Sequence, residues 1–215
     1  MKMKFVHIQL ECKHLEEMKT FYTDMLKLRL IDDKRDRFTV KAGLSRLTFI
    51  KAENRSYYHL CFRTNESFFD VMFQELESLL LPGEDGAVSL YWKGKQAYFH
   101  DPEGNVLEML ERKEEVPDLL LEWHDIVEVG LPCGSVEHMR RELAFLGNQF
   151  ESESDLFAFH GNGDGSVVVV KEGRHWYPTQ RGSEIHPIVL EVEDKAEFEY
   201  SHPVYPYKIS AKKEY

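Results

Sequence analysis

An internal repeat with a period of about 50 residues constrains the fold of this chain more than any other feature. Residues 4–12 alternate apolar and polar side chains as a half-buried strand does, and residues 14–26 carry apolar side chains at helical spacing. Three more short strands are predicted within residues 28–52, and the same order recurs over residues 57–110. We therefore predict two modules, each made of one strand, one helix and three strands.

The rest of the chain predicts a third module and part of a fourth. A strand over 124–132, a helix over 135–147 and strands up to residue 173 repeat the pattern. A last strand, 186–194, begins a fourth unit, and the remaining 21 residues are too few to complete it. We expect the tail over 201–215, which has two prolines, to be coil or one strand.

The charged stretch after residue 110, followed by Val116-Pro117-Asp118, predicts a linker. We divide the chain into a complete two-unit domain over 1–113, a linker over 114–120, and a region over 121–215. This last region holds the third unit, the truncated fourth unit and the tail.

Composition narrows the class of partner. The chain has 215 residues with 38 acidic and 27 basic side chains, and its net charge of −11 disfavours nucleic acid and anionic membranes as partners. No apolar run approaches the ~18 residues of a membrane span. Three widely spaced cysteines do not suggest a disulfide framework, so we expect a soluble cytoplasmic protein.

Three residues of metal-ligand type lie on predicted strands. His7 and His59 occupy the same place in the first strand of each unit, 52 residues apart, and Glu108 lies on the last strand of the second. Strand alternation puts each of them on the face opposite the apolar residues. We expect all three to point into one cavity and to hold one divalent metal, leaving positions for water and a chelating substrate.

Two sequence segments carry a resemblance to a known family. The segment FYTDML (21–26) and the closing segment YFHDPEGNVLEML (98–110) resemble the vicinal oxygen chelate superfamily, which includes glyoxalase I, fosfomycin-resistance thiol transferases, extradiol dioxygenases and bleomycin-binding proteins. The resemblance is good over 4–112 and weaker over 120–192. It implies an α+β fold in which repeated βαβββ units form cupped mixed sheets around a metal, with helices on the outer face.

The resemblance does not single out one member. Counted from the turn glycine, Leu47 stands where glyoxalase I has a fourth ligand. Tyr98 lies ten residues before Glu108, as in extradiol dioxygenases, but no histidine base lies between His14 and His59. The resemblance implies a catalytic role for Tyr98.

The fosfomycin transferases match best in ligand positions, but two of their features are missing. Gln9 stands where they have a threonine, and LYWKGKQ (90–96) replaces their potassium loop. A phosphonate site needs convergent cations. The candidates are Lys93, Lys95, Arg46 and Arg63.

The third unit carries Glu128 where the first has His7, if Met139 is matched to Met18. The same glycine count puts Val169 at its closing position. We therefore expect the third unit to fold without a metal site of its own.

We predict a metal-dependent enzyme acting on a small oxygen-chelating substrate. A lyase, isomerase or thiol transferase is favoured, with Mn, Fe, Ni or Zn as the metal, and a homodimer is compatible with the family. One alternative is a non-catalytic drug-binding protein of the bleomycin-resistance type, with Tyr57, Trp92 and Tyr98 lining a cleft. An extradiol-type dioxygenase is a second alternative, and an inactive scaffold that associates through its third unit is a third.

Overall fold

The structure, a computed structural model, describes residues 3–84, 86–91, 94–112, 121–146, 154–194 and 197–213. Its described helices are α1 (Leu15–Thr20), the π-helical η1 (Phe21–Met25), α2 (Glu66–Glu75), η2 (Glu77–Leu79), α3 (Val136–Glu142) and η3 (Ala144–Leu146). The described strands are β1 (Lys4–Cys12), β2 (Arg29–Lys34), β3 (Arg37–Ala42), β4 (Ser45–Lys51), β5 (His59–Thr64), β6 (Leu80–Leu81), β7 (Ser89–Tyr91), β8 (Gly94–His100), β9 (Val106–Glu111), β10 (Asp125–Cys133), β11 (Phe157–Asn162), β12 (Gly165–Lys171), β13 (Ile188–Asp194), β14 (Phe198–Ser201) and β15 (Tyr207–Lys213). None of the described helices is long and apolar enough to cross a lipid bilayer.

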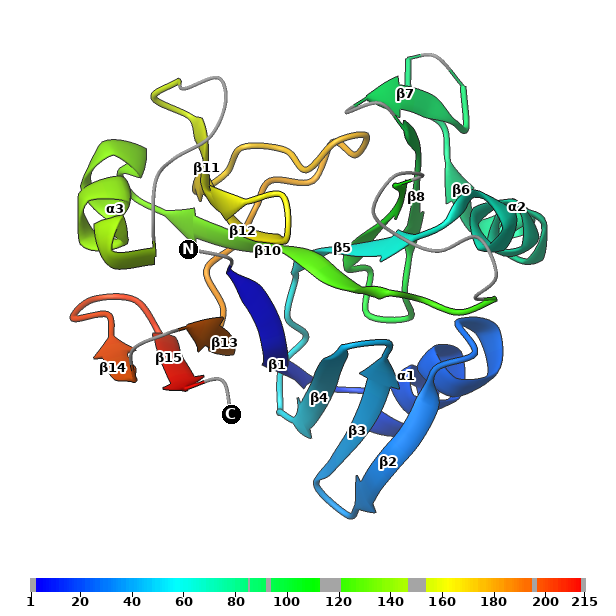
Figure 1. The fold of residues 1–215 in the computed structure, drawn as a ribbon, viewed down its shortest axis with the longest axis horizontal. Coiled ribbons are helices and arrows are strands. Elements are labelled where there is room, and N and C mark those ends of the chain that lie inside the picture. Colours follow the sequence, from blue (N-terminus) through cyan, green and yellow to red (C-terminus); the bar gives the residue numbers. More distant parts are fainter. Residues whose placement is uncertain are drawn as a thin grey trace.

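The strands form two mixed sheets (Figure 1). The first has the order β14-β15-β13-β1-β4-β3-β2, and the second has the order β11-β12-β10-β5-β9-β8-β6, with β7 paired to β8. The predicted α+β class and the repeated units are confirmed. The helix of the second unit begins where the sequence indicates, because the Asn65 side chain caps it by accepting a hydrogen bond from the Phe68 N–H at 2.8 Å.

The strands pair differently within a unit and between units, and the sequence does not predict which units pair. Within a unit the first and last strands lie parallel, as in β1 with β4 and β5 with β9. Between units the first strands pair antiparallel, β1 with β13 and β5 with β10. The first sheet therefore joins units one and four, and the second joins units two and three. The division into 1–113 and 121–215 does not coincide with the sheets, and the predicted linker lies outside the described residues.

The prediction of coil or one strand for the tail over 201–215 is confirmed within its described residues, because β15 is the one strand that begins there. β15 pairs antiparallel with β14, which ends at Ser201, and lies parallel to β13. Tyr207, Ile209 and Ala211 alternate into the main core. A fourth unit fits into the remaining length because it lacks a helix between its first two described strands.

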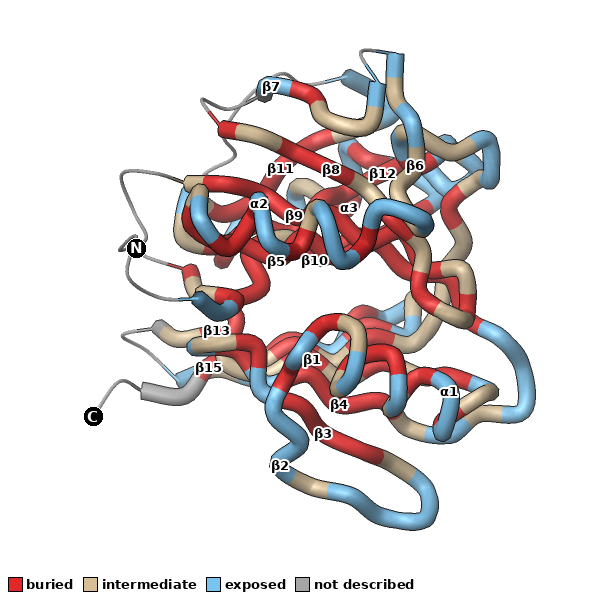
Figure 2. The backbone as a smooth tube through the Cα atoms, turned by 90° about the vertical axis from the view of Figure 1, so that its right-hand side faces the viewer, coloured by how far each residue is buried: buried red, intermediate tan, exposed pale blue. Residues whose placement is uncertain are grey.

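The main hydrophobic core lies between the two sheets and includes side chains from all three α-helices, such as Met18, Phe69 and Met139. Figure 2 shows the two groups of strands one above the other, with buried residues concentrated on their central strands. In η1, Tyr22 packs on Phe49 of the first sheet at 4.8 Å and Phe21 on Phe99 of the second at 6.5 Å. The expected outer layer of helices is thus not confirmed, since this helical segment lies between the sheets.

A buried ion pair clamps the second sheet at its centre. Arg63 on β5 donates two hydrogen bonds to Asp125 on β10, from Nε at 2.9 Å and from Nη2 at 2.6 Å, and both side chains are buried. The two residues are direct cross-strand partners. The pair therefore fixes the register of unit two against unit three.

We predict that Arg63→Leu lowers the free energy of unfolding by about 3–5 kcal/mol, because it leaves the Asp125 carboxylate buried without its partner. Chemical denaturation measures the change. The control is Arg37→Leu, which removes an exposed pair with Asp36 and costs about 1 kcal/mol or less. Equal losses in the two variants would contradict the clamp.

Candidate metal centre

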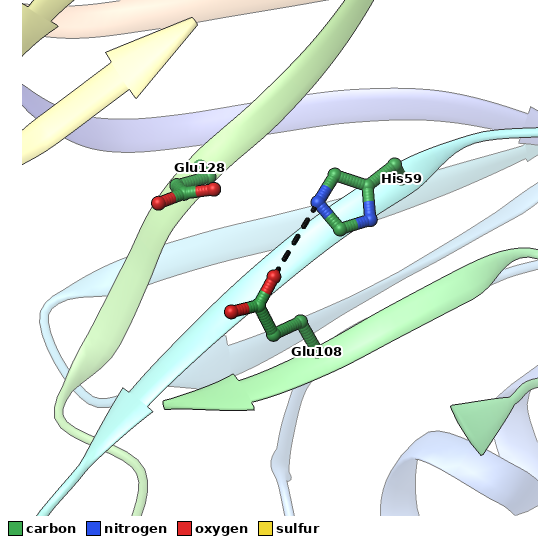
Figure 3. Close-up of side chains that lie close together, drawn as sticks. All are labelled: His59, Glu108 and Glu128. Carbon is green, nitrogen blue, oxygen red and sulfur yellow. Dashed lines mark ion pairs between the residues drawn. The ribbon is translucent and has the colours of Figure 1, made fainter. Parts of the chain in front are cut away.

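Three ligand-type side chains converge on the second sheet. His59 on β5, Glu108 on β9 and Glu128 on β10 each offer a ligand atom, and these atoms all lie within 4.8 Å of one another (Figure 3). The closest ion-pair contact is 3.7 Å, from His59 Nε2 to Glu108 Oε2. Among the described residues this is the one group of three or more His, Cys, Asp or Glu side chains that meets this distance.

Strand register explains the convergence. Cys61 is the direct partner of Glu108 on one side and of Glu128 on the other, so the two carboxylates flank it in one row. His59 lies two residues before Cys61 and therefore on the same face. A β-bulge between Ile126 and Glu128 shifts the register just before Glu128. Bulges commonly re-aim a side chain at a site in this way.

His59 is prepared as a neutral ligand. Its Nδ1–H donates to the carbonyl oxygen of Val106 at 3.2 Å, which assigns the free lone pair to Nε2, the nitrogen that faces Glu108. The ring stacks on Trp176, with centroids 4.7 Å apart and planes 22° apart. Burial lowers the pKa of His59 to about 4, so the imidazole stays uncharged at neutral pH.

The two carboxylates lie on either side of Cys61, Glu108 buried and Glu128 partly buried. Burial, followed by the charge of Glu128, raises the pKa of Glu108 well above its usual range, and burial raises the pKa of Glu128 to about 7. Arg112 lowers both pKa values but does not offset the burial. Two acidic groups and a neutral imidazole form a donor set that fits a divalent metal ion.

Tyr98 lies at the edge of this cluster. It is the direct partner of Glu108 across β8 and β9, and the two side chains share a hydrogen bond. Burial and the nearby charge of Glu108 raise the pKa of Tyr98 well above its usual range. The phenol therefore stays protonated and acts as a donor toward the carboxylate.

A cavity of about 320 Å³ opens over the cluster. Its lining is mostly aromatic and acidic, and none of it comes from a helix. The lining residues are His59, Glu84, Ser89, Gln96, Tyr98, Glu108, Glu128, Phe157, Phe159, Val168, Arg174, Trp176 and Tyr177.

The chain between β12 and β13, residues 172–187, covers this cavity and is named here the covering loop (gold to orange in Figure 1). Trp176 stacks on His59, and Tyr177 packs edge-on against Tyr98 with centroids 5.3 Å apart. The Tyr177 hydroxyl accepts a hydrogen bond from the Glu84 N–H at 3.2 Å. The loop thus spans from the third unit to the second.

The structure does not bring His7 to the cluster. His7 lies on β1 in the first sheet, where its Nε2 is 2.8 Å from the Thr48 hydroxyl. The expectation that it shares a cavity with His59 and Glu108 is corrected, because unit one pairs with unit four. Glu128, aligned with His7 in the sequence and then set aside, takes the third place.

The glycine count also needs correction. In the first unit the position that corresponds to Glu108 is Thr48, because Thr48 pairs with the residue two after His7. In the third unit the corresponding position is Val168, which lines the cavity. Leu47 and Val169 instead point into the main core. The count fails because the loop before Glu108 spans 101–105, whereas the other two units have tight turns at 43–44 and 163–164.

The remaining candidates from the sequence do not gather at the cavity. Arg63 is paired with Asp125, Lys95 with Asp70 and Arg46 with Glu191 in the other sheet. Lys93 and Trp92 lie outside the described residues. Tyr57 lies beside the cavity wall, under the covering loop, with its hydroxyl 3.2 Å from that of Thr179.

Comparison with known proteins places the fold in a family. The family model of the Glyoxalase/Bleomycin resistance protein/Dioxygenase superfamily matches residues 4–109, and this part of the chain belongs to that superfamily. A search of functionally curated proteins found no match.

Solved structures resemble the chain over nearly its whole length. A candidate dioxygenase from Bacillus subtilis subsp. subtilis str. 168 is 13% identical, with a TM-score of 0.67 over 98% of this chain and 85% of that one. Glyoxalase I from Zea mays is 11% identical, with a TM-score of 0.58 over 98% of this chain and 92% of that one. At these identities the likeness concerns the fold alone.

We predict that His59→Ala, Glu108→Ala and Glu128→Ala each lose tight binding of a divalent metal, whereas His7→Ala keeps it. Loss of a direct ligand is expected to exceed the roughly 10- to 100-fold that an outer partner costs. Titration of metal-free protein with Mn²⁺ and Zn²⁺, followed by elemental analysis, measures this. Metal loss in His7→Ala together with metal retention in Glu128→Ala would instead support the ligand set predicted from the sequence, in which His7 takes the place of Glu128.

We also predict a stability cost of the site without metal. Because the pKa of Glu128 rises from 4.5 to about 7 on folding, the free energy of unfolding of metal-free protein falls as the pH rises through this window, and the raised pKa of Glu108 adds to the fall. At about 1.4 kcal/mol per pKa unit, the loss from Glu128 is on the order of 3 kcal/mol. Glu128→Gln should reduce this slope, which Glu108 then carries alone, and the variant should be more stable than wild type at pH 8. An unchanged slope in urea denaturation from pH 4.5 to 8 would contradict it.

Proposed function

We propose that the chain is a metal-dependent enzyme that acts on a small oxygen-chelating substrate, with the metal held by His59, Glu108 and Glu128. The observation that supports this most is the convergence of these three side chains beneath a cavity large enough for a small molecule. We also propose that the protein is cytoplasmic, and the three buried free cysteines of the chain are consistent with that location.

The ligand set favours one kind of chemistry. One imidazole and two carboxylates differ from the two-histidine, one-carboxylate set typical of Fe(II) oxygenases. Carboxylate-rich sites suit Mn²⁺, and imidazole suits Zn²⁺ or Ni²⁺. We therefore favour a lyase, isomerase or thiol transferase over a dioxygenase. When bound, such a metal supplies Lewis-acid polarisation of substrate oxygens.

The protein side chains have separate roles in this proposal. Tyr98 holds its proton and lines the cavity, so it donates a hydrogen bond to Glu108 or to a substrate oxygen. Trp176 and Tyr177 cover the cluster and limit the access of water. His59 keeps its orientation through Val106 and Trp176.

A ligand screen tests the proposal. Thermal shifts of metal-free and metal-loaded protein are compared for small dicarbonyl, catechol and phosphonate compounds. The proposal expects at least one class to stabilise the metal-loaded protein and not the metal-free protein, with turnover then assayed for that class. Equal stabilisation with and without metal would instead support the non-catalytic binding protein, whose aromatic wall would suffice.

Tyr98→Phe is predicted to keep the metal and to weaken binding or turnover of the chelating ligand by about 10-fold or more, because the variant loses the donor and keeps the ring. Metal titration and the ligand assay are run on the same preparation. Tyr57→Phe is the matched control, since its hydroxyl meets Thr179 and not the cluster. Ligand affinity and turnover that match wild type would remove Tyr98 from the site.

A further inference from the structure

Arg174 is the one cationic side chain among the described residues that line the cavity. It follows β12 at the start of the covering loop, and its backbone is fixed on both sides. Its N–H donates to the Lys171 carbonyl at 2.9 Å, and its own carbonyl accepts from the Ser183 N–H at 2.8 Å. Gly173 before it has a φ of +83°, which glycine adopts without strain.

The guanidinium of Arg174 is positioned but not neutralised. It lies over the ring of Phe157 at 4.6 Å, and Nη1 donates to the His175 carbonyl at 3.3 Å. No described carboxylate forms an ion pair with it. Arg181 on the same loop differs, because it pairs with Glu184 at 2.7 Å and lies over Tyr57, outside the cavity.

Burial makes this cation costly without a partner. The Arg174 side chain is half-buried, and burial lowers its pKa, yet a guanidinium stays protonated in proteins. Its charge contributes to lowering the pKa of His59, after the larger effect of burial. The exposed Glu84 is the one other charged lining residue outside the ligand cluster.

The walls beside Arg174 are flat and apolar. Phe157, Phe159, Trp176 and Tyr177 contribute aromatic rings to the lining of the cavity. The Trp176 side chain is only 3% exposed, and its Nε1–H has no hydrogen-bond partner among the described residues. A buried indole N–H usually has an acceptor.

We propose that Arg174 forms an anion subsite and that the substrate is a small aromatic or conjugated carboxylic acid. In this proposal, which rests on the proposed function, two neighbouring oxygens of the substrate face the metal centre. The flat body lies along the aromatic wall, and the carboxylate meets the Arg174 guanidinium in a charge-assisted pair. Arg174 would thus decide which oxygen-chelating molecules the site accepts.

The test uses two probes that differ only in the carboxylate, catechol and 3,4-dihydroxybenzoate. Isothermal titration of metal-loaded protein, freed of excess metal, gives the affinity of each. We expect wild type to bind 3,4-dihydroxybenzoate at least about 10-fold more tightly than catechol. Arg174→Met should reduce this preference to less than about 2-fold and leave the affinity for catechol nearly unchanged. Arg181→Met is the matched control and should keep the full preference.

The outcomes separate this inference from the proposed function. Metal-dependent binding of both probes without a preference for the carboxylate would overturn the subsite and leave the metal enzyme standing. A preference that depends on Arg174 but not on metal would support the subsite and overturn the proposed metal chemistry. Failure of both probes to bind metal-loaded wild type, or equal loss of preference in the two arginine variants, would overturn the subsite.

Discussion

The antiparallel pairing of β5 with β10 is the interaction on which the rest of the structure depends. It joins the second and third units, and the buried pair of Arg63 and Asp125, 62 residues apart in the chain, fixes its register. That register puts Glu128 beside Cys61 and thus beside Glu108. A one-residue slip would turn Glu128 to the other face and leave two ligands.

The site opposes the stability of the fold that builds it. Two carboxylates share one row across the sheet, and each has a raised pKa because burial disfavours its charged form. The surrounding sheet keeps them in place through strand pairing on both sides. Affinity for a cation is therefore gained from the same repulsion that weakens the metal-free protein.

The order of elements within each unit could be predicted from the sequence, because strand and helix periodicity are local. The same periodicity put His59 and Glu108 on the right faces. The position of His7 could not be predicted, because the choice of partner for each first strand depends on contacts across the whole chain. Leu47 and Thr48 illustrate a second limit of the sequence. A different loop length shifts the count from the turn glycine by one residue, and a shift of one residue along a strand moves a side chain from one face of the sheet to the other. The covering loop has no periodicity, so the positions of Trp176 and Arg174 at the cavity could not be predicted from the sequence.

The exchange of units between sheets also means that the homologous region is not a folding unit. Residues 4–109 contain half of each sheet, and the complementary halves come from beyond residue 121. A chain cut between the halves would expose β1 and β5 as central strands without their antiparallel neighbours. Long unpaired strands of this kind recruit other chains. Such fragments would therefore associate with each other or aggregate, and mixing the two halves would be the way to recover a sheet with its metal ligands.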